Sequence, residues 1–174
     1  YFDSKKNILE MSYADFAANN IALGAAFSKL GLKGKRIAVV GESCPEWIMT
    51  YVATLSIGSI SVPLDKELAI DELFNFLEIS EADAIVFTKS FCAKFKDRIL
   101  ASAGNLLFIP IDCDDEELLK CDKIKTFPNI LELGRSEVEN GYIPEETEAS
   151  EETSEEVIDE NVAEESDGKE DSEE

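Results

Sequence analysis

Residues 36–65 constrain the fold more than any other part of the chain. Residues 37–40 form an unbroken apolar run, which is typical of a strand covered on both faces. Gly41 then turns the chain, and Ser43 and Glu46 have the spacing of a capping box that opens a helix, with Pro45 in its first turn. A second apolar strand is expected at 60–64, after Gly58. This order predicts a parallel strand-helix-strand unit.

The same alternation of strands and helices continues along the chain. A helix is expected between Ser12 and Gly31. Ser12 and Asp15 have capping-box spacing at its start, and Gly31 is a suitable C-cap at its end. Ser90 is expected to cap the helix that ends before Gly104. The further strands are expected at 84–88 and 106–111, and the further helices at 71–80, 91–103, 116–119 and 127–139. We predict an α/β fold, a mostly parallel sheet with central strands at 37–40, 60–64, 84–88 and 106–111 and helices on both faces, preceded by a β-hairpin over residues 1–11.

The acidic residues divide the chain into two regions, which we place at 1–142 and 143–174. Residues 145–174 hold 16 of the 38 acidic residues and one of the 16 basic residues, in a chain of net charge −22. This segment has too little apolar content to form a core, so we expect an acidic disordered tail or connector. The negative charge argues against nucleic acid and anionic membranes as partners, whereas a basic protein is a possible partner for the tail.

The composition excludes several kinds of site. The chain has no histidine, which removes histidine bases and histidine metal ligands. Its four cysteines, Cys44, Cys92, Cys113 and Cys121, include no pair with CxxC spacing and are expected to be reduced thiols of a cytoplasmic protein. No secretory signal or membrane-spanning stretch is expected, and because Tyr1 is not Met we expect the chain to start inside a longer reading frame or to follow a removed segment.

The turn at 41–43 lies where many folds bind phosphate, between a strand and a helix. The chain has neither GxGxxG nor GxxxxGK[ST] there, and Glu42 would repel a phosphate group. We therefore interpret this turn as a structural helix start.

The other candidate positions also favour structural roles. Residues 112–117 contain an acidic cluster. This cluster lacks the alternate ligands and the central glycine of a calcium loop, and it suits a helix N-terminus better. Trp47 is expected in the core or at an interface, Cys44 is expected to be unreactive, and Lys33, Lys35 and Arg36 are expected to form a solvated turn. The residues of the acidic cluster are Asp112, Asp114, Asp115, Glu116 and Glu117. We predict no catalytic, cofactor-binding or metal-ligating residue in this chain.

Five stretches together carry a family resemblance: residues 11–16, 31–42, 45–47, 51–68 and 72–88. In order and spacing they resemble the N-terminal region of AMP-forming acyl-CoA synthetases, within the adenylate-forming superfamily. The long-chain fatty acid–CoA ligase type is the most similar, although Ser43 stands where those enzymes usually have Asn. The resemblance is good over residues 1–90 and rests on pattern alone over 91–140.

The resemblance implies an enzyme that activates a fatty acid with ATP and transfers the acyl group to CoA, releasing AMP and pyrophosphate. ATP, Mg²⁺ and CoA are implied for the parent enzyme, and none of them for this fragment. The phosphate loop, the adenine and Mg²⁺ motifs and the mobile C-terminal domain of the family have no counterpart in this sequence. The chain is then an incomplete subdomain of a larger fold, a scaffold that is inactive by itself and whose partner is the remainder of the synthetase.

Two other classes of function stay open on the sequence. The chain could be a stand-alone α/β interaction module whose acidic tail binds a partner protein. It could also be a flavodoxin-like binding domain, for which bound flavin would be the sign.

Overall fold

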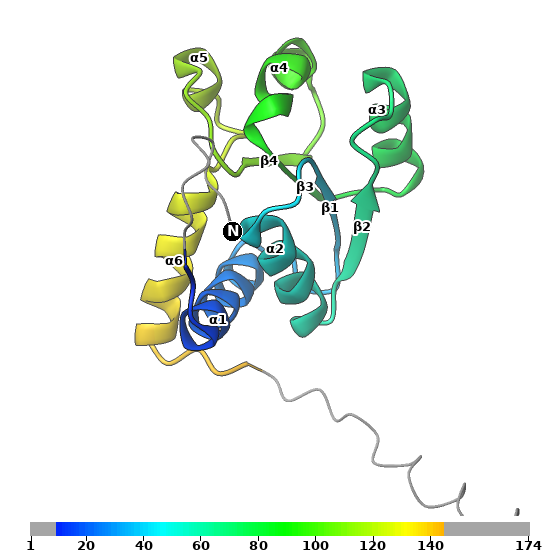
Figure 1. Ribbon diagram of the computed structural model, residues 1–174. Helices are drawn as coiled ribbons and strands as arrows, with labels where there is room; N and C mark the ends of the chain where they lie inside the picture. Colours follow the sequence, from blue (N-terminus) through cyan, green and yellow to red (C-terminus); the bar gives the residue numbers. More distant parts are fainter. Residues whose placement is uncertain (1–9, 145–174) are drawn as a thin grey trace, which may run out of the picture.

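The structure is a computed structural model, and it describes residues 10–144. Its described part is an α/β fold with a parallel sheet between two layers of helices (Figure 1). The expected hairpin lies outside the described residues except for Glu10 and Met11, which belong to no strand. In chain order the elements are α1 (Tyr13–Lys29), β1 (Arg36–Val40), α2 (Pro45–Ser56), β2 (Ile60–Leu64), α3 (Ile70–Ile79), β3 (Ala84–Phe87), the short 3₁₀ helix η1 (Lys89–Phe91), α4 (Cys92–Ala101), β4 (Leu107–Pro110), α5 (Glu116–Leu119) and α6 (Phe127–Glu139).

The four strands pair in the order β2-β1-β3-β4, and every pair is parallel. The register places Val40, the last residue of β1, opposite both Leu64 of β2 and Phe87 of β3. The carboxyl ends of these three strands therefore meet at one edge of the sheet. The predicted parallel sheet is confirmed.

The side chains of β1 alternate between two apolar clusters, one on each face of the sheet. Ile37 and Val39 belong to the cluster that α1, α2 and α6 cover. Ala38 and Val40 belong to the cluster that α3, α4 and α5 cover. Figure 1 shows these two groups of helices on opposite sides of the sheet. Successive side chains of a strand point to opposite faces of the sheet, so an apolar residue is needed at every position of 37–40 to fill both clusters.

Glycines end the two helices beside β1 and β2. Gly31, with φ of 75°, follows α1, and the backbone N–H of Leu32 donates to the carbonyl of Phe27 at 2.9 Å. Gly58, with φ of 67°, follows α2, and Ser59 donates to Thr54 at 3.1 Å. Both ends are Schellman motifs, whose left-handed residue glycine adopts without steric cost.

The starts of the helices differ in part from the expectations. Ser12 caps α1 as expected, and its hydroxyl accepts from the backbone N–H of Asp15 at 3.0 Å. The cap of α2 is Cys44, not Ser43, because Pro45 takes the first helical position and holds the preceding residue in extended conformation. The predicted pairing of Ser43 with Glu46 as a capping box was therefore wrong.

The helix expected at 91–103 is shorter at both ends. The 3₁₀ helix η1 precedes it, and α4 itself begins at Cys92. Ser90 therefore lies inside η1 and not at a cap position. Helix α4 ends at Ala101, three residues before Gly104. The prediction that Ser90 caps this helix was wrong because the Ser90 hydroxyl donates to the carboxylate of Glu42 instead.

Strand β2 was expected among the central strands, but it forms an edge of the described sheet. The backbone N–H of Ile60 points to β1 and donates to the carbonyl of Lys35 at 2.9 Å. Because backbone groups alternate in direction along a strand, position 63 points to the outer side. Its residue is Pro63, which has no N–H to donate, so the outer edge of β2 lacks a donor that a further strand would need.

Among residues 10–144, no helix combines the length and the apolar character that crossing a membrane requires.

Helices α1 and α6 pack closely against each other. A Cβ atom placed on Gly134 of α6 would lie 1.7 Å from the backbone carbonyl oxygen of Ala22 in α1. No side-chain rearrangement can relieve a clash with backbone. The absence of a side chain at Gly134 therefore sets the distance between the two helices.

Replacing this glycine tests the contact. We expect Gly134→Ala to lower the free energy of unfolding by about 2 kcal/mol, since α1 and α6 must move apart. Gly104→Ala is the matched control, because its Cβ meets no atom within 4 Å and its expected change is within about 0.5 kcal/mol. Urea unfolding followed by circular dichroism measures both, and equal stability of the two variants would contradict the described helix packing.

Candidate functional site

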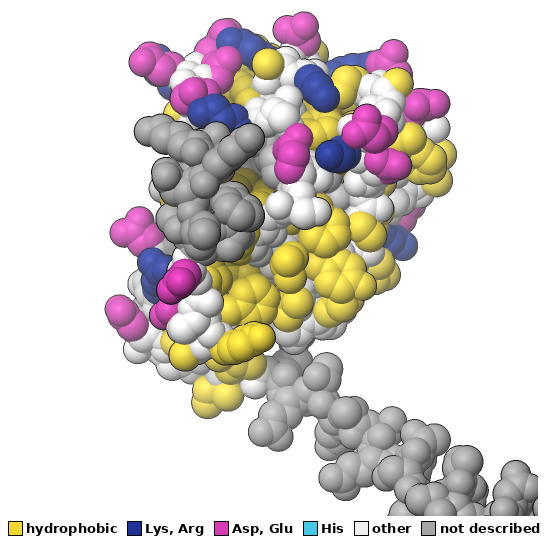
Figure 2. Space-filling view, viewed as in Figure 1, with side chains coloured by type: hydrophobic (Ala, Val, Ile, Leu, Met, Phe, Trp, Pro, Cys, Tyr) yellow, Lys and Arg dark blue, Asp and Glu magenta, His cyan; other side chains and the backbone are white. Residues whose placement is uncertain are grey.

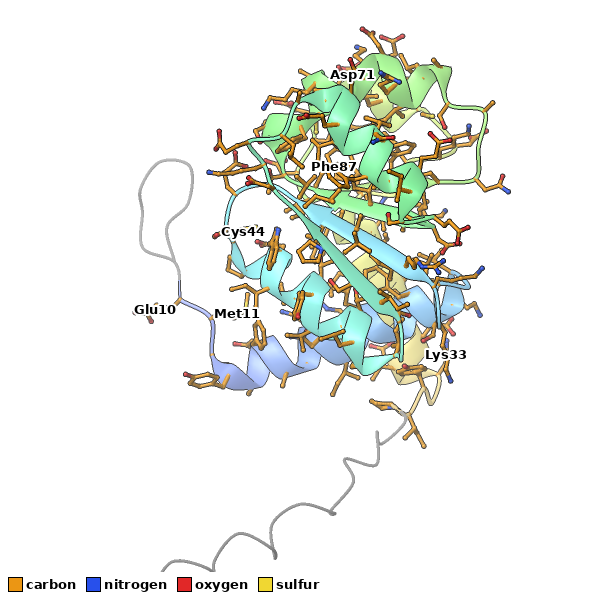
Figure 3. All side chains as sticks on the ribbon, turned by 90° about the vertical axis from the view of Figure 1, so that its right-hand side faces the viewer. Glu10, Met11, Lys33, Cys44, Asp71 and Phe87 are labelled. Atoms are coloured by element: carbon orange, nitrogen blue, oxygen red, sulfur yellow. The ribbon has the colours of Figure 1, made fainter. Side chains whose placement is uncertain are left out.

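The strand order reverses between β1 and β3, at the carboxyl edge of the sheet. From β1 the chain crosses through α2 to β2 on one side, and β3 lies on the other side. Ligands of open parallel sheets bind at such a reversal, outside the carboxyl ends of the strands. Residues 41–43 and 88–90 line this position, which makes it the first candidate for a functional site. Figure 3 shows Cys44 at this end of the sheet and Lys33 at the opposite end.

The residues after β1 and β3 are in close contact. Gly41 has φ of 136°, and a Cβ atom on it would lie 2.2 Å from Oγ1 of Thr88. Only glycine fits here, because both the backbone angle and the space exclude a side chain. This approach brings the backbone N–H of Glu42 within 3.4 Å of Oγ1 of Thr88, to which it donates.

The Glu42 carboxylate accepts hydrogen bonds from the hydroxyl of Thr88 and from that of Ser90, the latter at 3.0 Å. The Thr88 hydroxyl is the main cause that lowers the pKa of Glu42, while partial burial acts in the opposite direction. The Ser90 hydroxyl and the positive charge of Lys66 lower the pKa further. An ionised carboxylate thus lies at the reversal of the strand order, and it would repel the phosphate of a nucleotide there.

Sequence reasoning identified Glu42 but missed Thr88 and Ser90 as its partners. The signal was present, since 84–88 was expected to be a strand parallel to 37–40. Residues that follow two neighbouring parallel strands share one edge, so 41–42 and 88–90 were bound to be close.

The acidic residues after β4 pair with three lysines, Lys89, Lys96 and Lys120. Nζ of Lys89 lies 2.9 Å from a carboxylate oxygen of Asp114, and Nζ of Lys96 lies 2.8 Å from Asp115 and 2.9 Å from Glu117. Asp115 also caps α5, where its side chain accepts from the backbone of Glu117 at 3.0 Å. The expected structural role of the cluster at a helix start is thus visible at Asp115, and no group of three or more ligands for a metal ion occurs within residues 10–144.

Desolvation by burial raises the pKa of two of the four cysteines. It raises the pKa of the Cys44 thiol to about 11 and that of Cys92 to about 12. Cys92 also donates from Sγ to the carbonyl of Asp112 at 3.4 Å. A thiol that stays protonated at neutral pH is a poor nucleophile, which fits the expectation for Cys44.

Trp47 packs partly buried against the cluster of α1, α2 and α6, as expected. Its ring lies parallel to that of Tyr51, with centroids 6.1 Å apart. Of the residues expected in a solvated turn, Arg36 instead begins strand β1. Nζ of Lys35 lies 3.5 Å from a carboxylate oxygen of Asp83, and the Arg36 guanidinium lies 2.9 Å from the carboxylate of Glu81. These ion pairs connect neighbouring segments of the fold.

Comparison with known proteins decides the family. The AMP-binding enzyme family matches residues 5–172, nearly the whole chain. The chain belongs to this family. D-alanine–D-alanyl carrier protein ligase of Streptococcus pneumoniae is 30% identical over 83 residues, which cover 47% of this chain and 16% of that ligase. Crotonobetaine/carnitine–CoA ligase of Salmonella paratyphi A is 29% identical over 98 residues, covering 55% of this chain and 19% of the ligase.

The fold agrees with that of solved members of the superfamily. Coronafacic acid ligase of Pectobacterium brasiliense has a TM-score of 0.64 at 25% identity, over 70% of this chain and 24% of the ligase. The adenylation domain of a carboxylate reductase of Mycobacterium chelonae has a TM-score of 0.63 at 18% identity, over 78% of this chain and 25% of that domain. This AMP-binding enzyme chain thus spans less than a fifth of the curated relatives it matches and about a quarter of the solved chains.

The carboxyl edge of this AMP-binding enzyme chain does not fit the phosphates of ATP. The ionised Glu42 occupies it, held by two hydroxyl groups that would otherwise be free to donate to a phosphate. No reaction step is therefore assigned to the described residues.

Removing the Thr88 hydroxyl tests the arrangement at Glu42. We expect Thr88→Val to raise the pKa of Glu42 toward its ordinary value, because the largest favourable contact of the carboxylate is lost. In the wild-type chain the folded-state pKa lies below the unfolded one, so ionised Glu42 stabilises the fold above the unfolded pKa. This stabilisation disappears as the pH falls through the folded pKa, and in Thr88→Val the corresponding loss is smaller.

NMR titration of the Glu42 carboxyl carbon measures the pKa directly, and urea unfolding between pH 3 and pH 7 measures the linked stability. Thr88→Ser is the control, since it keeps the hydroxyl and is expected to keep the lowered pKa. An unchanged pKa in Thr88→Val would contradict the assigned hydrogen bond.

The raised pKa of Cys44 gives a second test. With a pKa of about 11, Cys44 is expected to react with iodoacetamide at pH 7.5 roughly 100-fold more slowly than an unperturbed thiol, because its thiolate fraction is lower by that factor. Mass spectrometry of peptides after timed labelling measures the rate, with the chain in guanidinium chloride as the reference. Equal rates at Cys44 in the folded and unfolded chain would contradict its partial burial and raised pKa.

Proposed function

We propose that this chain is the N-terminal part of an ATP-dependent, AMP-forming acyl-CoA ligase. The observation that carries the proposal is the match to the AMP-binding enzyme family over residues 5–172, together with a parallel sheet of the same fold as the solved ligases. The overall reaction joins a carboxylic acid to CoA and releases AMP and pyrophosphate. Because the chain spans only part of its relatives, the activity belongs to the assembled enzyme.

We propose a fatty acid as the carboxylic acid substrate. The order and spacing of the stretches 31–42, 45–47 and 51–68 support the long-chain fatty acid type. CoA is supported as the acceptor by the crotonobetaine/carnitine–CoA ligase, which aligns with a larger share of this chain than the D-alanyl carrier protein ligase does. A carrier protein as the acceptor is the alternative that the second relative suggests.

The proposed role of residues 10–144 is structural support. Strand β1 is buried on both faces, and the turn at Gly41 is closed by Thr88, so the carboxyl edge has a fixed shape. We assign ATP, Mg²⁺ and CoA to other parts of the enzyme, because the carboxylate at this edge opposes phosphate. We also propose that the enzyme is cytoplasmic, in keeping with four free cysteines, and that the acidic segment 143–174 is a connector with a basic protein as a possible partner.

Release of pyrophosphate tests the proposed function. We expect the 174-residue chain to release none with ATP, Mg²⁺ and fatty acids of increasing length. The full-length protein encoded by the same reading frame is expected to release pyrophosphate with one class of fatty acid and to form the acyl-CoA thioester when CoA is added. D-Alanine with a carrier protein is the comparison substrate. Activity of the 174-residue chain that Glu42→Gln abolishes would overturn the proposed role as support.

A further inference from the structure

Three of the four cysteines lie in one part of the fold. Cys92 is the first residue of α4 and belongs to the apolar cluster that α3, α4 and α5 cover, while Cys113 and Cys121 pack against the same cluster. All three are free thiols. Cys92 and Cys113 follow β3 and β4, which are neighbouring parallel strands, so both residues lie near the carboxyl edge of the sheet.

Two ion pairs hold Cys113 against the start of α4. Nζ of Lys89 lies 3.7 Å from a carboxylate oxygen of Asp112 and 2.9 Å from one of Asp114, and Lys89 is only three residues before Cys92. Asp112 and Asp114 are exposed, whereas Cys113 between them is half-buried and packs on the cluster. Figure 2 shows the charged side chains on the outside of this part of the molecule, over the α4 and α5 side. The Cys113 side chain therefore faces the cluster that contains Cys92.

The Cys92 thiol is in direct contact with this segment. Its Sγ donates to the carbonyl oxygen of Asp112 at 3.4 Å, and this carbonyl belongs to the peptide bond that joins Asp112 to Cys113. The Cys113 thiol is also a hydrogen-bond partner of the Cys92 thiol. The two thiols are thus neighbours, which is the arrangement that disulfide formation requires.

The two thiols differ in their access to solvent. Cys92 is 5% exposed, and burial, followed by the hydrogen bond with Cys113, raises its pKa to about 12. It is therefore a poor nucleophile toward an oxidant in solution, and the half-buried Cys113 is the thiol that an oxidant reaches first. The carboxylates of Asp112 and Asp114 repel anionic oxidants such as glutathione disulfide, so uncharged hydrogen peroxide suits this position.

We propose that Cys113 and Cys92 form a redox-sensitive pair that hydrogen peroxide converts to a disulfide. The Cys113 sulfur attacks one peroxide oxygen, the O–O bond breaks, and Cys113 becomes a sulfenic acid while its thiol proton leaves in a water molecule. The Cys92 sulfur then attacks the Cys113 sulfur, the S–O bond breaks, and the hydroxyl group leaves with the proton of Cys92 as a second water. Two thiols lose two electrons, and one peroxide is reduced to two waters.

The disulfide would have two consequences for the chain. It would tie the segment after β3 to the segment after β4, two residues from the Ser90 hydroxyl that donates to Glu42. It would also protect Cys113 from further oxidation to sulfinic acid, which ordinary thiol reductants do not reverse. Neither consequence depends on the acid that the enzyme activates, so the pair is independent of the proposed function.

Peptide mapping of the oxidised 174-residue chain tests the proposal. The chain is treated with hydrogen peroxide, remaining thiols are blocked with N-ethylmaleimide, and tryptic peptides are analysed without reductant by mass spectrometry. Trypsin separates the three cysteines into peptides 90–94, 99–120 and 121–123. We expect peptides 90–94 and 99–120 to be linked, with the link absent before oxidation and lost in dithiothreitol. The control Cys121→Ser is expected to keep this link.

A second variant tests the order of the two steps. In Cys92→Ser the partner thiol is missing, so we expect the link to be lost, dimedone to capture the sulfenic acid on Cys113, and sulfinic acid to accumulate there. Circular dichroism checks that this variant is folded, and the map of the wild-type chain decides the question if it is not.

Three results for the wild-type chain would overturn the proposal. One is a link between peptides 99–120 and 121–123, because Cys121 would then be the partner of Cys113. Another is a disulfide-linked dimer on a non-reducing gel in place of the internal link. The third is Cys113 oxidised to sulfinic acid as readily as in Cys92→Ser, because Cys92 would then give no protection.

Discussion

Burial of β1 on both faces is the constraint on which the other layers depend. Ile37, Ala38, Val39 and Val40 are all fully buried, and each contributes to one of two clusters. The same strand pairs with β2 on one side and β3 on the other, so it fixes the register of both. Each helix layer packs on side chains that β1 presents, which makes this strand the common reference for the positions of α1, α2 and α6 and of α3, α4 and α5.

The carboxyl edge shows how a position that suits a ligand can be used for structure. Gly41 permits the chain to pass close to Thr88, and the resulting space is taken by the carboxylate of Glu42 and two hydroxyl groups. Glu42 is ionised at neutral pH, and its lowered pKa keeps the negative charge at this point under more acidic conditions as well. Membership of the family does not require a phosphate site at this edge, because the chain aligns with about a quarter of a solved ligase.

The sequence was sufficient for the order of the elements and insufficient for some of their ends. Apolar runs such as 37–40 and glycines such as Gly31 act locally, and the strands together with the helix ends at Gly31 and Gly58 are confirmed. Ser43 and Ser90 failed as caps because their roles depend on other parts of the chain or on the conformation of a neighbour. Because Pro45 is the first residue of α2, the N-cap position falls on Cys44 and not on Ser43. The hydroxyl of Ser90 donates to the carboxylate of Glu42, which lies 48 positions earlier in the sequence. The edge position of β2 likewise depends on which strands are its neighbours.

The contact between α1 and α6 has a consequence for synthesis of the protein on the ribosome. Strands β1 and β2 can pair soon after they are made, but α1 needs a helix that begins at Phe127. At ordinary rates of synthesis, the interval of about 100 residues corresponds to roughly 5–20 s. During this time the inner face of α1 is without its final partner. That face combines small residues such as Ala22 and Ala26 with Leu23 and Phe27, which are fully buried in the folded chain, so the nascent helix exposes large apolar side chains until its partners are made.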